Sequence, residues 1–352
     1  MQYIEIAREK LNKLRDRDDF LILAFESSCD ETACSVVKGR KVLASMISSQ
    51  IEIHKRFGGV VPEIASRNHT LAIDSLLTET LDAAGVTLKD IDVVAVTYGA
   101  GLLGALLVGL CYAKALAYAL DLPLIAVNHI KGHIASNYIT HPDLNPPYIA
   151  LIVSGGHTNI YEVQGFADKD MISLGQTRDD AIGESFDKVA RILGLGYPGG
   201  PKVEKLAKQG NKEAFKFTRP FRNEDHLDFS FSGIKTAIAN LVSNSKARGD
   251  EINAADLAAS FQNSVVSYVV DNTIRAAKDK NLKTIVLAGG VAANSALREE
   301  LTQAAQKEGM TVKLPEFVYC TDNAAMIGVA AYEEIKAGIE PSDLDLDADP
   351  SL

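Results

Sequence analysis

Two histidines and one aspartate are the residues whose types and spacing could bind a metal ion. His129 and His133 lie in PLIAVNHIKGHIASNYI, which predicts a short strand ending near Asn128 and then a helix. Side chains four residues apart share one helix face, so both imidazoles can reach one cation. Asp322, in YCTDNAAMIG, is predicted at a strand end just before an apolar helix. Two histidines and one carboxylate leave coordination positions open, as in catalytic zinc and non-haem Fe(II) sites.

Each of these residues also has a plain structural alternative. Two exposed histidines at this spacing occur by chance on helices, and Asp322 fits the position of a helix N-cap. A metalloprotease needs the general-base glutamate of H-E-x-x-H, whereas Ile130 and Lys131 occupy that interval here,. The pattern therefore indicates a metal site without the base of a protease.

Loops of small residues follow predicted strands at three places. LILAFESSCDETACSVV (21–37) and YIALIVSGGHTNIYEV (148–163) each predict a strand-turn-strand hairpin, and TIVLAGGVAAN (284–294) predicts a strand, a glycine turn and a helix starting near Ser295. Small residues let backbone N–H groups approach phosphate oxygens, and a helix N-terminus adds favourable partial charge. Taken singly, each glycine pair is more often a plain turn.

Two hairpins half a chain apart, followed by a strand-turn-helix unit, match the duplicated layout of actin, sugar kinases and heat-shock ATPases. We therefore predict an α/β protein with a two-lobed actin-like ATPase (ASKHA) fold, in which duplicated mixed-sheet lobes surround a nucleotide cleft. Ligands of such open sheets bind at the strand ends where the loops gather.

The predicted organisation has four parts. An N-terminal helical extension covers 1–19, and the N-terminal lobe covers 20–145 and is completed by 320–339. The C-terminal, nucleotide-binding lobe covers 146–319, and an acidic tail covers 340–352. That tail, EPSDLDLDADPSL, carries five acids and no base, so we expect a solvated and partly disordered end,.

Composition limits the possible classes of protein. The 352 residues, 47% of them hydrophobic, are enough for two packed cores,. A net charge of −10 argues against general nucleic-acid binding, because phosphate contacts need Lys and Arg,. The first twenty residues lack the features of a signal or transit peptide, so a cytoplasmic location is expected,.

Two further patterns exclude other classes. The four cysteines lack CxxC spacing, which argues against a zinc ribbon or a disulfide framework and predicts reduced thiols,. The stretch from Val93 to Lys114 has no charged residue before Lys114 and has the length of a membrane span, but four glycines divide it into a predicted strand, turn and core helix,. No membrane association is predicted.

Nine blocks of sequence together resemble the tRNA N6-adenosine threonylcarbamoyltransferase family, whose bacterial members are called TsaD and were once described as glycoproteases. The blocks extend from about Ile22 to Lys336. In chain order they are FESSCDET, FGGVVPEIASRNH, YGAGLLGALLVG, NHIKGH, LIVSGGHT, GESFDKVARILGLGYPGGP, DFSFSGIKTA, AGGVAANSALR and CTDNAAMIG.

The resemblance implies roles for particular residues. The metal ligands would be His129, His133 and Asp322, and the metal would be one divalent ion, with Fe(2+) favoured and Zn(2+) possible. Nucleotide contacts would fall on a turn, two helix starts and two carboxylates. These residues are Ile152, Val153, Ser154, Gly155, Gly156, Asp187, Gly200, Glu204 and Asn294. Glu204 would contact ribose, at a position where several relatives carry aspartate.

The resemblance also implies the reaction. The donor would be threonylcarbamoyl-AMP, made by another enzyme, with an ATP/AMP-type nucleotide site in the cleft. The acceptor would be the exocyclic amine of the adenosine 3′ of the anticodon, in tRNAs reading codons that begin with A, and AMP would leave. Asp30 and Glu31, on the first loop, are the candidates for taking the proton of the amine,.

The implied partners are tRNA, a degenerate scaffold paralogue of the same fold (TsaB-like) and a small P-loop ATPase (TsaE-like). Two other classes remain open. O-carbamoyltransferases share this fold and a similar metal site, but they generally carry extra domains that 352 residues do not accommodate. A non-catalytic scaffold would lack the metal trio, which is present here.

Overall fold

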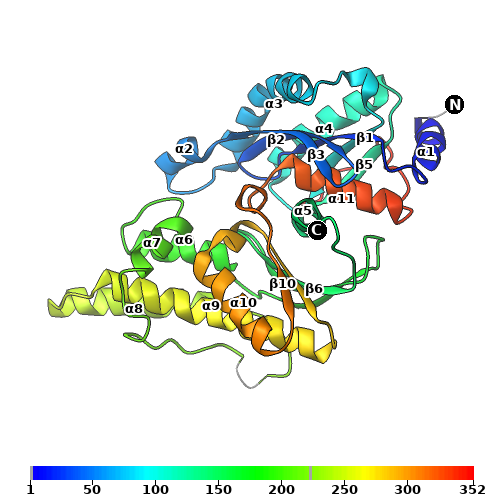
Figure 1. Ribbon diagram of the computed structural model, residues 1–352. Helices are drawn as coiled ribbons and strands as arrows, with labels where there is room; N and C mark the ends of the chain where they lie inside the picture. The colour runs from blue at the N-terminus through cyan, green and yellow to red at the C-terminus, as the bar shows by residue number, and fades with distance from the viewer. Residues whose placement is uncertain (1–2, 222–223) are drawn as a thin grey trace. The chain divides into compact units, whose positions relative to one another are not determined.

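The computed structural model describes residues 3–221 and 224–352, and these form two compact units (Figure 1). Unit 1 contains Met1–Leu144, Gly165–Asp170 and Pro315–Leu352. Unit 2 contains Asn145–Gln164 and Met171–Leu314. The chain thus leaves unit 1, builds unit 2, and returns to complete unit 1 with its last helix and tail.

Unit 1 is built on a mixed five-stranded sheet with the order β3-β2-β1-β4-β5. The strands are β1 (Leu21–Glu26), β2 (Glu31–Lys38), β3 (Lys41–Ser49), β4 (Val93–Gly99) and β5 (Leu124–Asn128). The first three pair antiparallel, whereas β1, β4 and β5 run parallel to one another. The carboxyl ends of the three parallel strands therefore lie at one edge of the sheet.

Helices cover both faces of this sheet. They are α1 (Tyr3–Leu14), α2 (Ile51–His54), α3 (Pro62–Ala84), α4 (Leu103–Ala119), α5 (His129–Thr140) and α11 (Ala324–Lys336), with 3-10 turns η1 (Lys55–Phe57), η2 (Leu88–Asp90) and η4 (Phe317–Tyr319). Because side chains alternate along a strand, Leu23 and Phe25 join the core under α3 and α4. Ala24 faces α11 instead, where Gly328 allows close approach to Ala24 and Val37.

Unit 2 repeats the same strand arrangement. Its strands are β6 (Tyr148–Val153), β7 (Thr158–Val163), β8 (Met171–Gln176), β9 (Thr284–Ala288) and β10 (Thr311–Lys313), and the sheet order is β10-β9-β6-β7-β8. As in unit 1, the first three strands pair antiparallel and the first strand pairs parallel with the fourth. The duplicated mixed sheets expected from the sequence are thereby confirmed.

The helices of unit 2 are α6 (Ile182–Ile192), α7 (Gly200–Ala207), α8 (Ser232–Arg248), α9 (Ala254–Asp279) and α10 (Ser295–Lys307), with the 3-10 turn η3 (Gly290–Ala293). The long helix α9 contacts α7, α10 and β6. Its buried face, which includes Phe261 and Tyr268, forms much of the core of this unit.

The acidic tail differs from its predicted disordered state. Ser342 N donates to Leu124 O at 2.8 Å, and Asp349 N donates to Tyr98 O at 2.8 Å, so the tail lies along β5 and β4. Leu346 packs against the hydrophobic core of unit 1. The alternating sequence explains the difference, since every second residue is apolar and can face the protein while the intervening acids stay exposed,.

Most other predicted elements are present where expected. Val93–Gly99 and Leu103–Ala119 form β4 and α4, and no helix in the described part of the chain is long and apolar enough to cross a membrane. The predicted strand end before Asp322 is wrong, because a 3-10 turn, Phe317–Tyr319, precedes it. This segment belongs to unit 1, which the chain re-enters at Pro315. A strand there would need a neighbouring strand to supply hydrogen bonds.

Candidate functional site

The two histidines of the candidate metal site begin helix α5. The side chain of Asn128, at the end of β5, accepts a hydrogen bond from Ile130 N at 2.7 Å and caps the helix,. His129 and His133 therefore occupy the first two turns, one above the other, and their ring centroids lie 4.6 Å apart. Strand end and cap together fix where both imidazoles lie.

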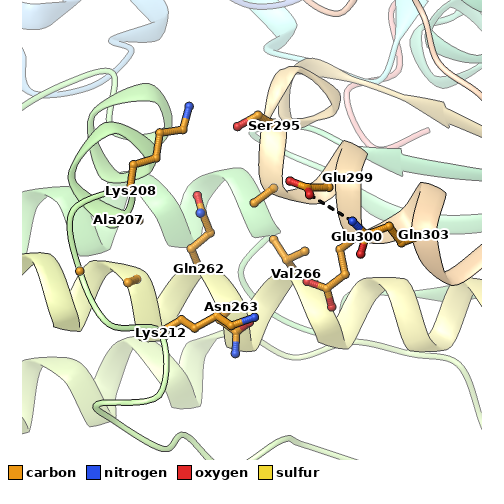
Figure 2. A pocket seen from close by; sticks show the side chains of 13 residues that line it. Ala207, Lys208, Lys212, Gln262, Asn263, Val266, Ser295, Glu299, Glu300 and Gln303 are labelled. Carbon is orange, nitrogen blue, oxygen red and sulfur yellow. Dashed lines mark hydrogen bonds between the residues drawn. The ribbon is translucent and has the colours of Figure 1, made fainter.

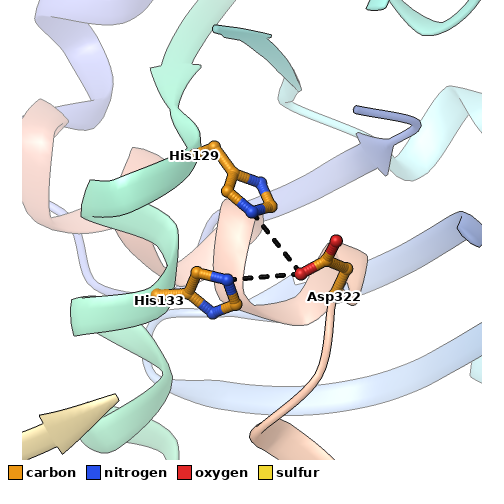
Figure 3. Close-up of side chains that lie close together, drawn as sticks. All are labelled: His129, His133 and Asp322. Atoms are coloured by element: carbon orange, nitrogen blue, oxygen red, sulfur yellow. Dashed lines mark ion pairs between the residues drawn. The ribbon is translucent and has the colours of Figure 1, made fainter. Parts of the chain in front are cut away.

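Asp322 completes the trio from the segment before α11. Its Oδ1 lies 3.4 Å from Nε2 of His129 and 3.2 Å from Nε2 of His133 (Figure 3). The N-cap of α11 is the next residue, Asn323, which accepts from Met326 N at 2.9 Å. The alternative interpretation of Asp322 as the helix cap is thus excluded, and its carboxylate faces the histidines.

Close packing of α5 and α11 brings these side chains together. Gly132 lies between the two histidines, and a Cβ atom added there would lie 2.7 Å from Ile327 Cδ1 on α11. A larger residue at this position would require the side chain of Ile327 to move. Since the ligands are shared between the histidines of α5 and the residue preceding α11, the glycine is part of what sets the geometry of the trio.

The electrostatics of the trio favour a positive charge. His129 and His133 are 5% and 0% exposed. Burial by itself lowers the pKa of His129, but the carboxylates of Asp322 and Glu26 outweigh burial and raise that pKa well above its usual value. Burial raises the pKa of Asp322, yet the two histidines outweigh it and hold that pKa well below its usual value,.

These residues fit a divalent cation. One ligand atom from each of His129, His133 and Asp322 lies within 4.8 Å of the others. Among the described residues, Nδ1 of His133 is buried without a hydrogen-bond partner, so no protein group draws that ring away from the trio. Imidazole nitrogens and a carboxylate suit zinc or iron(II), and three protein ligands leave room for substrate.

Of the two candidate proton acceptors, Asp30 lies on the loop between β1 and β2, and Glu31 is the first residue of β2. Asp30 is 7% exposed, and its Oδ2 has no hydrogen-bond partner among the described residues. Burial, with the carboxylates of Asp322 and Asp30 nearby, raises the pKa of Glu31 to about 9. A cation bound to the trio would oppose the contribution of Asp322. When no cation is bound, Glu31 is protonated at neutral pH. Asp30 is therefore the better placed acceptor.

A buried histidine that the sequence analysis did not single out holds this loop. His69 lies on α3, and its Nε2 is 3.0 Å from Cys29 O while its Nδ1 is 2.7 Å from Thr32 Oγ1. Burial lowers the pKa of His69, which favours the neutral ring that donates through one nitrogen and accepts through the other,. The signal was present, because His69 closes the block FGGVVPEIASRNH.

In unit 2, the predicted phosphate loop is the turn between β6 and β7. Ile152 and Val153 end β6, and Ser154 N donates to His157 O at 2.8 Å to close the turn. A Cβ atom added to Gly155 or Gly156 would have no atom of a non-adjacent residue within 4 Å. The backbone of both glycines is therefore accessible to a ligand.

Two neighbouring segments approach that turn closely. Gly183, in the first turn of α6, donates to Ser154 O at 3.1 Å, so the helix N-terminus lies against the turn. Gly289 has φ of 93°, and a Cβ there would lie 2.4 Å from Val153 O. Backbone N–H groups beside a helix N-terminus are the usual elements of an anion site.

The remaining predicted contacts already have partners within unit 2. Asp187 Oδ1 accepts from Gly199 N at 2.6 Å, beside the start of α7 at Gly200. Asn294 caps α10, since its Oδ1 accepts from Leu297 N at 3.0 Å, and its Nδ2 donates to Gln262. Each side chain therefore shapes the loops around it, and each retains only part of its hydrogen-bonding capacity for a ligand.

Glu204 connects α7 to the start of α10. Its Oε1 accepts from Ser295 N at 3.1 Å and pairs with Lys208 at 3.1 Å. Burial alone raises the pKa of Glu204, but Ser295 and Lys208 outweigh burial and lower it. The carboxylate is therefore ionised at neutral pH.

A pocket of about 410 Å³ lies beside the contact between Glu204 and Ser295, and it is lined by residues of α7, α9 and α10 (Figure 2). Lys208, Gln262, Ser295 and Glu299 line it with polar groups, and Val266 adds an apolar wall. Its volume is in the range of small-molecule sites. Two of its lining residues, Gln262 and Ser295, bond directly to Asn294 and Glu204.

Comparison with solved structures supports the fold. HypF from T. kodakarensis matches with a TM-score of 0.61 at 15% identity, over 91% of this chain and 48% of that one. Full-length HypF in a phosphate- and nucleotide-bound form matches with 0.59 at 18% identity, over 90% and 46%. Component A of the Acidaminococcus fermentans (R)-2-hydroxyglutaryl-CoA dehydratase matches with 0.52 at 15% identity, over 90% and 99%. The fold is thus of the actin-like ASKHA type.

Sequence relatives identify the family. The TsaD family model, described as tRNA N6-adenosine threonylcarbamoyltransferase, matches residues 41–329. A protein of that name from Clostridium perfringens is 56% identical over 336 residues, which are 95% of this chain and 98% of that protein. One from Clostridium botulinum is 56% identical over 337 residues, 96% and 98% of the two chains. The chain therefore belongs to the tRNA N6-adenosine threonylcarbamoyltransferase family, a family of transferase enzymes.

Proposed function

We propose that this chain transfers the threonylcarbamoyl group from threonylcarbamoyl-AMP to the exocyclic amine of the adenosine 3′ of the anticodon, in tRNAs reading codons that begin with A. The N–H bond of the amine loses its proton, a new N–C bond forms at the carbamoyl carbon, and the C–O bond to phosphate breaks. AMP leaves with that electron pair. The observation that supports the proposal most strongly is the trio of two buried histidines, His129 and His133, with Asp322 in a member of this family.

We propose that the trio holds one divalent cation, with Fe(2+) favoured and Zn(2+) possible. The carboxylate of Asp322 and the unprotonated Nε2 atoms of His129 and His133 would be its ligands. When bound, such a cation supplies Lewis-acid stabilisation of negative charge on substrate oxygens. The low exposure of both histidines strengthens every electrostatic interaction at the site, because little water screens them,.

Asp30 is the proposed proton acceptor, with Glu31 as its neighbour. The unpartnered, buried Oδ2 of Asp30 provides an acceptor for an amine proton,. Glu31, the second candidate acceptor, is the next residue, and its pKa is raised to about 9 when no cation occupies the trio. His69 keeps this loop in place through Cys29 O and Thr32 Oγ1.

The AMP portion of the donor is proposed to bind in unit 2. The turn Ile152–Gly156, with the N-terminus of α6 against it, would contact the phosphate,. Glu204 and Asp187 would receive ribose hydroxyls, and the pocket beside Ser295 would accept the base. A phosphate- and nucleotide-bound HypF with the same fold supports placing a nucleotide in this fold.

Partner proteins are proposed because the chain is acidic. Its net charge of −10 opposes binding to a polyanionic tRNA,. The short basic stretches, His54 to Arg56 and Lys202, Lys205 and Lys208, supply few phosphate contacts, and Lys208 is already paired with Glu204. We propose that a same-fold scaffold paralogue (TsaB-like) and a P-loop ATPase (TsaE-like) supply the remainder, in the cytoplasm.

The test is a direct assay of the modified nucleoside. Purified protein is incubated with threonylcarbamoyl-AMP and unmodified tRNA, with and without the two partners, and tRNA nucleosides are analysed by mass. The modified adenosine should form, and His133→Ala should abolish both metal content and product. His141→Ala, at the end of the same helix but outside the trio, is the matched control and should retain both.

Three results would overturn parts of the proposal. Absence of product from tRNA under all partner combinations, with product formed on a small alcohol, would exclude the tRNA acceptor. Full metal occupancy in His133→Ala would exclude the trio as the metal site. Full multiple-turnover activity of the isolated chain at physiological salt would exclude the need for partners.

A further inference from the structure

A buried carboxylate that no step above uses lies directly behind the metal trio. Glu26 is the last residue of β1 and is 1% exposed. Its Oε1 accepts from Ser28 N at 2.5 Å, and its Oε2 accepts from Thr97 Oγ1 at 2.5 Å. The same Oε2 lies 3.0 Å from Nδ1 of His129. Both oxygens of the carboxylate are therefore engaged, and one of them contacts a predicted metal ligand.

The sheet fixes this arrangement. β1 and β4 pair in parallel, and β4 pairs in parallel with β5, so Glu26, Thr97 and the residue that follows β5 lie at the same sheet edge. His129 is that residue, at the first position of α5. Three strand ends thus place the carboxylate, its hydroxyl donor and the imidazole within hydrogen-bonding distance, without any flexible segment between them.

The contact determines which nitrogen of His129 is available. A carboxylate accepts hydrogen bonds only, so Nδ1 must carry the proton when it bonds to Glu26. The lone pair of the neutral ring is then on Nε2, the atom that faces Asp322 Oδ1 at 3.4 Å. In His133, by contrast, Nδ1 has no hydrogen-bond partner among the described residues, so the trio contains one fixed and one unfixed imidazole.

We propose that Glu26 is a positioning residue for the metal site, which orients the ring of His129 and selects its Nδ1–H tautomer so that Nε2 is a metal ligand. The inference rests on the proposed metal site. Partners of this kind behind metal-ligating histidines typically change metal affinity by about 10- to 100-fold when removed.

Glu26→Gln is the sharpest perturbation. A neutral amide has one oxygen, whereas the native site needs an acceptor for Ser28 N and another for the imidazole. If the amide oxygen faces Ser28, its NH2 group faces Nδ1 of His129 and requires that nitrogen to accept. The proton would then move to Nε2, where it competes with the metal. Side-chain volume hardly changes, so packing is preserved.

Ser28→Ala tests an alternative partner for the same atom. Ser28 Oγ lies 3.2 Å from Nδ1 of His129, farther than Glu26 Oε2. A hydroxyl can donate as well as accept, so it does not by itself select a tautomer. Removing it should therefore change metal affinity much less than Glu26→Gln does.

The experiment measures binding of Co(2+) and Zn(2+) to the metal-free full chain, using the visible spectrum of cobalt and competition with a chelator. Glu26→Gln should weaken binding about 10- to 100-fold, and Ser28→Ala about threefold or less. Glu334→Gln is the matched control, because Glu334 is equally buried in unit 1 but contacts Lys131 rather than the trio. Its metal affinity should remain within about threefold of the wild type.

A second measurement needs no substitution at Glu26. In the zinc-loaded wild type labelled with 15N histidine, the His129 ring should carry its proton on Nδ1, with the assignment made from the signal lost in His129→Asn. Protonation of Nε2 would overturn the inference even if Glu26→Gln failed to fold. Equal metal affinity of wild type and Glu26→Gln would overturn it too.

The inference and the proposed metal site fail in different ways. If the wild-type chain binds neither metal, or if His133→Ala binds as well as the wild type, the metal site itself is wrong. If the wild type binds and His133→Ala does not, while Glu26→Gln binds normally, only the role of Glu26 is wrong.

Discussion

Substituting Glu334 by glutamine should make the stability of unit 1 less sensitive to pH. Glu334, on α11, is 1% exposed; its Oε1 pairs with Lys131 Nζ at 2.7 Å, and its Oε2 has no hydrogen-bond partner among the described residues. Burial outweighs the attraction of Lys131 and raises the pKa of Glu334 from 4.5 to about 7. A carboxyl group with one unsatisfied, buried oxygen is expected to keep its proton in this way.

The sign of the effect follows from proton binding. Between pH 4.5 and about 7 the folded state keeps the proton on Glu334 while the unfolded state has lost it. The free energy of unfolding therefore falls as pH rises through this window. At about 1.36 kcal/mol per pH unit, the wild type should lose roughly 3 kcal/mol that Glu334→Gln does not lose. Below pH 4.5 the difference between the two proteins should be constant.

The assay is urea unfolding, followed by far-ultraviolet circular dichroism, of wild type and Glu334→Gln at pH values from 4.5 to 8. The stability of the variant relative to the wild type should increase by roughly 3 kcal/mol across this range. Glu340→Gln is the control, because Arg8 and Arg15 lower the pKa of Glu340. The stability difference between this variant and the wild type should therefore not change with pH above about pH 5. A flat difference for Glu334→Gln as well would refute the buried, protonated carboxyl.

Two further substitutions and one deletion test the loops and the tail. Gly289→Ala should destabilise the protein by about 2 kcal/mol or more in thermal melts, because φ is 93° and the new Cβ meets Val153 O,. Gly290→Ala is the control and should be nearly neutral, because the space around Gly290 is open. Equal melting temperatures of the two variants would refute the close approach of Gly289 to Val153. Deleting residues 342–352 should lower stability by about 2–4 kcal/mol through lost hydrogen bonds and lost burial of Leu346,, and an unchanged melt would mean that the tail does not pack in solution. Asn323→Ala should lower the free energy of unfolding by about 1 kcal/mol, because the cap of α11 is lost,. The same change should weaken zinc binding, because this cap fixes the turn that carries Asp322. Unchanged zinc affinity would show that other contacts place Asp322.

The trio was predictable because two of its members are local. His129 and His133 are four residues apart after an apolar strand, so helical periodicity alone places them on one face,. The hairpins at 21–37 and 148–163 were predictable for a similar reason, since hydrophobic runs interrupted by small polar residues specify strands and turns locally,. These local patterns do not show which residues far apart in the sequence come into contact.

Long-range partners needed the folded chain. The pairing of Glu26 with His129 joins residues 103 positions apart, and no local pattern distinguishes Glu26 from any acid at the end of a strand. The tail was misjudged because charge alone suggested solvation, whereas the alternating apolar residues find a surface only once β4 and β5 are side by side. In the same way, Asn294 and Asp187 fit both a ligand contact and a structural role until their hydrogen-bond partners are known.

The sequence by itself determined the two hairpins, the duplicated layout, the family and the chemical types of the metal ligands, because these depend on residue order over short spans. Only the tertiary structure decided which residues lie behind the ligands. The parallel pairing of β1, β4 and β5 brings Glu26 to His129, and the close approach of α5 to α11 at Gly132 brings Asp322 to both histidines. Hydrogen bonds and metal ligation act over about 3 Å, so they depend on packing between distant segments, which a residue order specifies only through the complete fold.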